Sequence, residues 1–296
     1  MSRPDSRWIF LLVLLTIAGP QILLAADRPP LLGVAHISIA VTDAAKARAF
    51  YGGLLGYEES FSLKESDGSA PLLYFKVNNR QYFEISPTLP PGQDERLRHI
   101  AFETTEVETL RLYLAEKGVK VPEKVRADVD GSLSIVVTDP DGHLVKFVQY
   151  RTGSLQAKGD SLSPRRISDR LLHVGITVTD PAKADRFYKD ILGFSEFWRG
   201  GSTEGQTNWI NMRLPESTDY MEYMLVTGPL NRGRLGSAHH ACLLVTDMQK
   251  AMETLRERPG GWELKPPSVG RNNRWLMNLF DPDGTRTELM EPHTVR

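Results

Sequence analysis

The sequence predicts an α+β fold made of four repeated units, each a strand, a helix and about three further strands. The clearest copy of the strand and helix spans residues 173–194, and a nearly identical copy spans residues 36–57. Two looser copies begin at His99 and His240. The interval from His36 to His173 nearly equals the interval from His99 to His240, which indicates that a two-unit domain has been duplicated.

The two close copies carry the same signals for a strand and a helix. In residues 173–194, small or polar residues first alternate with β-branched residues, as in a strand with one packed and one open face. Asp180 then provides a helix N-cap and Pro181 the first helical position. Apolar residues follow at helical spacing until Gly193, where the helix is expected to end.

Shorter strand-like runs follow each predicted helix. Runs at 72–77 and 81–86 flank Asn78 and Asn79, which indicates a hairpin. Runs at 208–214 and 219–226 form a second pair around turn residues. The second and fourth units each end on a strand that follows an Asp-Pro-Asp-Gly turn.

These signals divide the chain of 296 residues into segments. Residues 1–26 place arginines before an apolar run and small residues before Asp27, as in a secretory signal peptide. We therefore expect export to the periplasm or outside the cell, or anchoring in the membrane through this segment if it is not cleaved. The first domain is predicted at 31–151, a polar linker at 152–169 and the second domain at 170–293.

Composition excludes some classes of function. The formal net charge of −1 leaves no strongly basic surface for nucleic acid. The single cysteine, Cys242, excludes an intramolecular disulfide. Four units in one chain complete both domains without a partner, so we expect a monomer.

Four metal-binding residue types occupy equivalent positions in the second half. The polar residue on the open face of each unit's first and last strand is His173, Glu222, His240 or Glu288. Two imidazoles and two carboxylates suit one divalent ion of zinc, nickel, iron, manganese or cobalt. His239 is expected to point to the opposite face of its strand.

The first half has an incomplete version of this set. His36, Glu84 and His99 correspond to three of the four residues, but Lys146 takes the place of Glu288. An ammonium about 4 Å from a bound monocation costs roughly 4 kcal/mol at an effective dielectric near 20. We therefore expect Lys146 to replace the metal or to pair with Glu84, and we expect Gln149 to face away from the site.

The chain resembles the vicinal oxygen chelate superfamily, which contains glyoxalase I, bleomycin-resistance proteins and extradiol dioxygenases. The resemblance spans about residues 32–292 and is most specific in residues 173–194 and in the Asp-Pro-Asp-Gly turn followed by Glu288. It implies βαβββ modules paired into two glyoxalase-like domains, each curving a mixed sheet into a cup. It also implies that His173, Glu222, His240 and Glu288 are metal ligands.

Three functions follow from the resemblance. The first is proton transfer on a small substrate chelated through adjacent oxygens, as in an isomerase or lyase, with Glu288 as the catalytic base. Thr177 and Val226 stand where glyoxalase I binds glutathione, so another substrate is expected. The alternative is extradiol ring cleavage, although Asn278 stands at the family's tyrosine position. The second alternative is a binding protein without turnover.

Several other side chains are candidates for contact with a substrate. Arg271 and Arg274 lie in the loop before the last hairpin, where they could hold an anionic group. Aromatic residues of the second half could line a pocket, namely Trp209, Tyr220, Tyr223 and Trp275.

Overall fold

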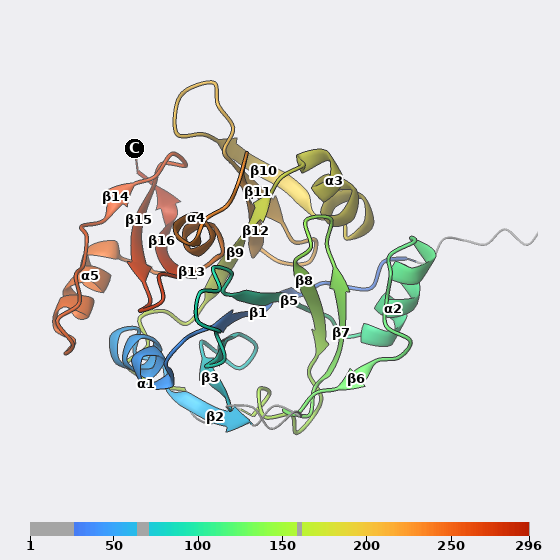
Figure 1. The fold of residues 1–296 in the computed structure, drawn as a ribbon, viewed down its shortest axis with the longest axis horizontal. Coiled ribbons are helices and arrows are strands. Elements are labelled where there is room, and N and C mark those ends of the chain that lie inside the picture. The colour runs from blue at the N-terminus through green and yellow to red at the C-terminus, as the bar shows by residue number, and fades with distance from the viewer. Residues whose placement is uncertain (1–26, 64–70, 159–161, 296) are drawn as a thin grey trace, which may run out of the picture.

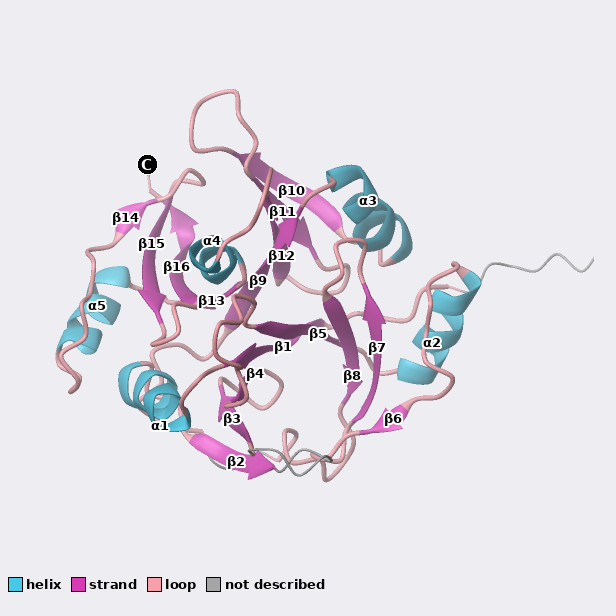
Figure 2. Cartoon of the chain, in the orientation of Figure 1, coloured by secondary structure: helices cyan, strands magenta, loops and turns pink. Residues whose placement is uncertain are grey.

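The computed structural model describes residues 27–63, 71–158 and 162–295, which form two curved eight-stranded sheets (Figure 1). Each sheet contains two strand–helix–three-strand units, as the sequence predicts. Figure 2 shows most strands toward the middle of the molecule and most helices around its edge. The predicted signal peptide lies outside the described residues. Within them, no helix is long and apolar enough to cross a membrane.

The first sheet has the strand order β2-β3-β4-β1-β5-β8-β7-β6. Its central pair, β1 and β5, is antiparallel, whereas β4 runs parallel to β1 and β8 runs parallel to β5. Its strands are β1 (Gly33–Ala40), β2 (Glu59–Leu63), β3 (Leu72–Lys76), β4 (Tyr82–Ser86), β5 (Leu97–Glu103), β6 (Arg126–Ala127), β7 (Leu133–Thr138) and β8 (Leu144–Gln149).

The second sheet repeats this topology in the order β10-β11-β12-β9-β13-β16-β15-β14. Strand β12 runs parallel to β9, β16 runs parallel to β13, and β9 and β13 are antiparallel. Its strands are β9 (Leu171–Val178), β10 (Ser195–Gly200), β11 (Trp209–Arg213), β12 (Tyr220–Leu225), β13 (His240–Leu244), β14 (Ser268–Val269), β15 (Arg274–Phe280) and β16 (Arg286–Thr294).

Each unit also has the helix that the sequence predicts. These helices are α1 (Ala44–Ala47), α2 (Val107–Glu116), α3 (Pro181–Asp185) and α5 (Met248–Arg256). The structure departs from the prediction because α1 and α3 continue as π-helical turns, η1 (Arg48–Leu54) and η2 (Arg186–Ile191). In η1 the neighbouring aromatic side chains of Phe50 and Tyr51 are both buried. An additional helix, α4 (Arg232–Ala238), was not predicted.

The two halves contact each other through helices, each of which donates a tyrosine hydrogen bond to a turn of the other half. The Tyr51 hydroxyl, from the first unit, donates to the Asp281 carboxylate in the turn before β16. In the same way the Tyr188 hydroxyl, from the third unit, donates to Asp139 in the turn before β8. The helix of one half therefore lies beside the last hairpin of the other half, as α1 and β15–β16 do in Figure 1. A continuous apolar core includes buried residues of both sheets.

The carboxylates of Asp139 and Asp281, which accept these two hydrogen bonds, have different charged neighbours. His143 forms an ion pair with Asp139 at 2.9 Å and, although burial opposes it, holds the pKa of Asp139 below its usual value. Thr285 takes the corresponding place beside Asp281, and burial raises the pKa of Asp281 to about 6. A carboxyl whose pKa is raised on folding stabilises the fold at low pH, and this contribution is lost as pH rises through the folded pKa.

We therefore expect Asp281→Asn to flatten the pH dependence of stability. A rise from 3.8 to about 6 corresponds to about 3 kcal/mol of unfolding free energy, which the wild type should lose relative to the variant between about pH 4 and pH 7. Thermal or urea unfolding at several pH values measures the difference. Asp139→Asn is the matched control, and the wild type should lose stability relative to that variant as pH falls through the acidic range and again as pH rises through the raised pKa of His143, the partner of Asp139. An equal pH slope for wild type and Asp281→Asn would contradict the assignment.

Candidate metal centre in the second domain

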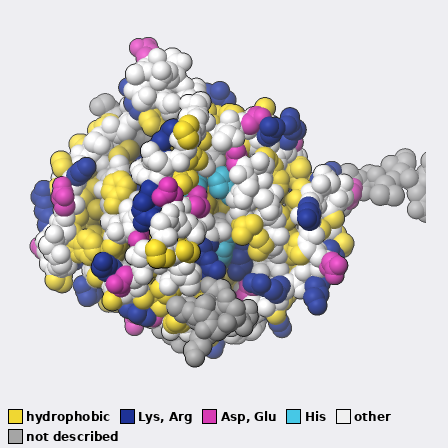
Figure 3. All heavy atoms as spheres, viewed as in Figure 1, with side chains coloured by type: hydrophobic (Ala, Val, Ile, Leu, Met, Phe, Trp, Pro, Cys, Tyr) yellow, Lys and Arg dark blue, Asp and Glu magenta, His cyan; other side chains and the backbone are white. Residues whose placement is uncertain are grey.

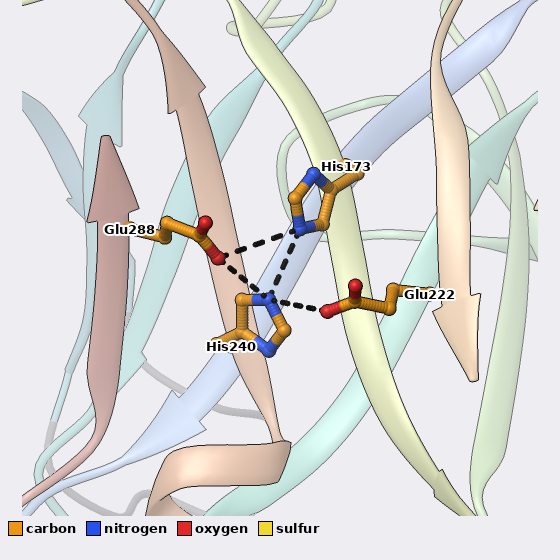
Figure 4. A group of neighbouring side chains, drawn as sticks. All are labelled: His173, Glu222, His240 and Glu288. Carbon is orange, nitrogen blue, oxygen red and sulfur yellow. Dashed lines mark hydrogen bonds and ion pairs between the residues drawn. The ribbon is translucent and has the colours of Figure 1, made fainter. Parts of the chain in front are cut away.

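Four adjacent strands at the centre of the second sheet carry the four predicted residues. Glu222 lies on β12, His173 on β9, His240 on β13 and Glu288 on β16. The register places Glu222 and His240 on either side of Gly175, and Cys242 lies between His173 and Glu288. Because side chains alternate along a strand, all four point into the cup and toward one another (Figure 4). One ligand atom from each lies within 4.8 Å of the others.

The nitrogen and oxygen atoms of this cluster converge on a small volume. The Nε2 atoms of His173 and His240 are 3.0 Å apart. Oε2 of Glu288 lies 3.9 Å from His173 Nε2 and 3.4 Å from His240 Nε2. Oε2 of Glu222 lies 3.5 Å from His240 Nε2.

The protonation of the imidazoles suits a metal. Burial, followed by the effect of neighbouring groups, lowers the pKa of both His173 and His240 well below the usual value, so both rings are neutral at neutral pH. Nδ1 of His240 lies 2.9 Å from the carbonyl oxygen of Ala238, to which it can only donate. This hydrogen bond leaves the Nε2 lone pair directed into the cluster, as metal-ligating histidines require. Tyr220 stacks on His173 with ring centroids 4.3 Å apart and so helps to fix that ring.

Gly175 provides the space that the His240 ring occupies. A Cβ atom at position 175 would lie 2.0 Å from Cε1 and 2.2 Å from Nδ1 of His240. Any larger residue would push the imidazole out of its position. The first domain has Ser38 at the equivalent register position, opposite Glu84, and His99 is more exposed there than His240 is here.

Arg286 is a member of the site that sequence reasoning missed. Its Nη2 atom lies 2.9 Å from His240 Nε2 and 3.9 Å from one oxygen each of Glu222 and Glu288. The same Nη2 atom lies 2.8 Å from His240 Nδ1, so the guanidinium is close to both ring nitrogens. Because arginine only donates and Nδ1 donates to Ala238, Nε2 is the ring nitrogen that can accept from it. The signal that could have found Arg286 is its spacing, since it precedes Glu288 by two residues on a strand and therefore shares its face.

We expect Arg286→Gln to raise the affinity of the second domain for divalent metal by about tenfold or more. The guanidinium repels a second cation at this distance and competes for His240 Nε2, and the variant removes both effects. Competition with a metallochromic chelator measures the change. Arg199→Gln is a matched control, because Arg199 pairs with Glu196 on an exposed strand outside the cup. Weaker metal binding by Arg286→Gln would show that Arg286 supports the site instead.

The carboxylates repel one another in this arrangement. Burial, and then the charge of Glu288, raises the pKa of Glu222 to about 8, although Arg286 acts in the opposite direction. Glu222 therefore holds a proton at neutral pH when no other cation lies between the two carboxyl groups. A divalent ion would take the place of that proton, and the donor set of two imidazoles and two carboxylates suits it.

A cavity of about 300 Å³ opens onto the cluster. Glu222, Glu288 and Arg286 form its floor, and Trp198 and Trp209 line it from β10 and β11. The remaining lining residues include Arg271 and Asn278 from the last hairpin and the loop before it.

The structure separates the substrate-contact candidates. Arg271 lines the cavity, and its Nε donates to the carbonyl of Gly201 at 2.8 Å. Arg274 is not among the described residues that line the cavity. Trp209 lines it as expected, whereas Tyr220 lies on His173. The expectation was wrong for the other three aromatic side chains, because Tyr220 is buried in that stack, Tyr223 is fully buried and Trp275 packs against the core.

The first cup contains three of the four residues in the same register. Glu84 on β4, His36 on β1 and His99 on β5 lie within 4.8 Å of one another. Lys146 on β8 pairs with Ala101 on β5, which lies two residues after His99. In the same way Glu288 pairs with Cys242, which lies two residues after His240. Lys146 therefore occupies the place of Glu288, as predicted.

The partner of Lys146 differs from the expected one. Its ammonium forms an ion pair with Asp128 at 2.8 Å, a residue that the sequence did not single out. Glu84 instead accepts a hydrogen bond of 2.6 Å from the Ser38 hydroxyl. Asp128 follows the short edge strand β6, whose position was not predicted, so its proximity could not be anticipated.

Other expected orientations are found in the structure. Gln149 turns away from the first cup and accepts from the backbone N–H of Val107 at the start of α2. His239 precedes β13 and points away from the cluster, toward Glu95 at 2.9 Å and the Thr177 hydroxyl at 3.0 Å. Cys242 is fully buried.

Solved structures with this architecture include several extradiol enzymes. The 2,3-dioxygenase LapB from Pseudomonas sp. KL28 is 18% identical with a TM-score of 0.67, over 90% of this chain and 93% of that one. An extradiol ring-cleaving dioxygenase from B. fuscum is 23% identical with a TM-score of 0.63, over 90% and 73%. Homoprotocatechuate 2,3-dioxygenase from Arthrobacter globiformis is 22% identical with a TM-score of 0.63, over 90% and 81%. At these identities the similarity establishes the fold.

No curated protein matches the chain. The family model of the Glyoxalase/Bleomycin resistance protein/Dioxygenase superfamily matches it twice, at residues 33–147 and 170–289. Each match covers most of one eight-stranded sheet. The chain therefore belongs to the glyoxalase, bleomycin resistance protein and dioxygenase superfamily.

Proposed function

We propose that the second cup is a metal-dependent active site for a small substrate that binds through two adjacent oxygens, and that its reaction is extradiol cleavage of a catechol by dioxygen. The observation that carries the proposal is the convergence of His173, His240 and Glu288, a two-histidine, one-carboxylate set, in the second of two fused domains. Structural similarity over 90% of the chain to three dioxygenases, one of them named as an extradiol ring-cleaving enzyme, supports this choice.

The residues of the second cup would have different roles in the reaction. His173, His240 and Glu288 would hold the ion, which when bound supplies a Lewis acid for the two substrate oxygens. Trp198 and Trp209 would flank an aromatic ring in the cavity.

Two further groups would act on the substrate directly. Glu222 would give up its proton when a divalent ion binds beside it, and its carboxylate, which lines the cavity, could then accept a proton from a catechol hydroxyl. Arg286 and Arg271 line the same cavity and would hold an anionic oxygen or substituent of the substrate.

Proton transfer between neighbouring carbons is the second candidate, and Glu222 favours it. Its Oε2 lies 3.5 Å from His240 Nε2, close to the 3.4 Å of Glu288, so the cluster offers four ligands. A four-ligand site leaves fewer open positions for a catechol and dioxygen together. In this reading Glu288 would be the base that moves the proton.

Two measurements on the purified protein test the proposal. With iron(II) bound, oxygen uptake and a coloured ring-opened product are expected from a substituted catechol under air, and neither is expected without oxygen. A 2-oxoaldehyde adduct that isomerises without oxygen would support proton transfer instead. Binding of either compound without turnover would favour a binding protein.

Glu222→Gln separates the two reactions by metal content. Ring cleavage requires only three ligands, so the variant should keep its metal and lose turnover. Proton transfer with four ligands predicts that the metal itself is lost or much weakened.

A further inference from the structure

A loop of the first domain contacts the segment of the second domain that leads into the metal cluster. This loop precedes β5, includes Glu95 and Arg96, and lies against α4. Figure 3 shows basic, acidic and histidine side chains together near the centre of the molecule's face, in the region where Figure 1 places α4. Because α4 ends two residues before His240, the position of this helix affects the position of that imidazole.

Arg96 is at the centre of the contact and is only 2% exposed. Its Nη2 atom donates to the carbonyl oxygen of Arg232 at 2.8 Å, at the first residue of α4. Its Nε atom donates to the Thr285 hydroxyl at 3.2 Å. Helix α4 leads into β13, which carries His240, and Thr285 is the last residue before β16, which carries Glu288. One guanidinium of the first domain therefore holds two segments that lead to residues of the metal cluster.

Helix α4 packs on this guanidinium without a gap. A Cβ atom at Gly236 would lie 2.0 Å from Arg96 Nη2 and 2.2 Å from the carbonyl oxygen of Gly284. Nη1 of Arg96 donates to the carbonyl oxygen of Asp94 at 2.8 Å, which fixes the guanidinium to its own loop. The close approach of α4 to Arg96 therefore depends on a glycine at position 236.

Helix α4 depends on such contacts because it is weak by itself. It has seven residues, two of which are glycines, and isolated helices shorter than about 12 residues are marginal in water. The same loop supplies a second contact, because the Glu95 carboxylate accepts from Nδ1 of His239, the C-cap of α4, at 2.9 Å. The residue before it is Ala238, whose carbonyl oxygen accepts from His240 Nδ1. The first domain thus fixes the carbonyl group that orients the His240 ring.

We propose that Arg96 is a positioning residue for the metal centre, through which the first domain holds His240 and Glu288 in the arrangement that binds one ion. Arg96 acts through Ala238 and Thr285, which precede these two residues along the chain. The proposal rests on the metal site of the proposed function but not on which reaction takes place there. It gives the first domain a role in the chemistry of the second, although its own cup lacks the fourth ligand.

Binding of cobalt(II) to the full chain, after removal of metal by a chelator, tests the proposal. Arg96→Gln should lower the cobalt affinity about tenfold, the lower end of the effect expected when a group that orients a ligand is removed. It should also shift the visible absorption bands of the bound cobalt, which depend on ligand geometry. Gly236→Ala should have both effects, because its Cβ separates α4 from Arg96 without changing any charge.

Arg258→Gln is the matched control for loss of an arginine between the halves. The Arg258 guanidinium also donates to backbone carbonyls, those of Leu54 and Arg165, and Arg258 lines neither cup cavity. This variant should lose stability toward urea, as Arg96→Gln should, but its cobalt affinity and spectrum should match those of the wild type. Thr285→Val is a milder variant that removes only the hydroxyl bound by Arg96 Nε, and it should shift the cobalt spectrum in a chain that folds normally.

The outcomes distinguish failure of this proposal from failure of the metal site. If the wild type does not bind cobalt, the metal site is refuted and the proposal with it. If the wild type binds cobalt and the folded Arg96→Gln, Gly236→Ala and Thr285→Val variants match its affinity and spectrum, the metal site stands and the role of Arg96 is refuted. Circular dichroism establishes that each variant is folded. An equal loss of affinity in Arg258→Gln would also refute the role of Arg96, because the effect would then follow from stability alone.

Discussion

Gly175→Ala is expected to lower the affinity of the second domain for divalent metal by about 100-fold or more. The new Cβ would lie 2.0 Å from Cε1 of His240, a distance at which one of the two groups must move. It would also lie 2.9 Å from the Ala238 carbonyl oxygen that accepts from His240 Nδ1. The imidazole would lose both its position and the hydrogen bond that fixes its tautomer. Chelator competition on the purified variant measures the loss.

Gly53→Ala is the matched control for this experiment. A Cβ at Gly53 would meet nothing within 4 Å, and position 53 lies in the π-helical turn η1, away from both cups. This variant should bind metal like the wild type, and any change in its stability should be small. Wild-type metal affinity in Gly175→Ala would mean that His240 is not a ligand in the arrangement described, and the assignment of the cluster would fail.

The fold could be predicted because its signals are local and repeated. Asp180, Pro181 and Gly193 mark the start and end of a helix in the sequence itself, and the structure uses Asp180 and Pro181 at the helix start as expected. The same signals recur around Asp43, so the second copy supports the first. Helix α4 was missed because residues 232–238 contain glycines and lack an apolar stripe, and its position depends on contacts with distant segments such as Arg96.

Only those residues of the candidate site that repeat between the units could be predicted from the sequence. His173, Glu222, His240 and Glu288 are recognisable because they repeat at equivalent strand positions, and the structure brings them within 4.8 Å. Arg286 has no counterpart of this kind, because Leu144 takes its place in the first half.

The ion-pair partner of Lys146 could not be predicted from the sequence. Asp128 contacts Lys146 from the position just after a two-residue edge strand, and neither residue type nor spacing in the sequence links the two positions. Long-range pairs of this kind depend on the curvature of the sheet, which side-chain periodicity does not encode.

The difference between the two cups rests on three substitutions at equivalent positions. Gly175, Arg286 and Glu288 of the second half correspond to Ser38, Leu144 and Lys146 of the first. The Ser38 hydroxyl donates to the Glu84 carboxylate, so one oxygen of Glu84 is less available to a metal. Lys146 places a cation where the second cup has its fourth ligand. A metal in the first cup would therefore meet both a repelling charge and an engaged carboxylate.

Glu288→Gln is accordingly expected to reduce the metal content of the purified chain from about one equivalent to nearly none. The amide keeps the size of the side chain but removes the charge of the carboxylate that approaches both imidazoles, at 3.9 Å and 3.4 Å. Elemental analysis of both proteins gives the stoichiometry directly. Glu253→Gln, on the exposed surface of α5, controls for loss of one carboxylate elsewhere and should retain the metal.

The wild-type stoichiometry carries separate information about the first domain. One equivalent per chain agrees with exclusion of metal by Lys146, whereas two equivalents would show that His36, Glu84 and His99 bind an ion despite the ammonium beside them. If Glu288→Gln kept one full equivalent, the metal would lie outside the second cup. The ring-cleavage and proton-transfer readings would then both lose their structural basis, because each requires the ion to be held by Glu288 together with His173 and His240.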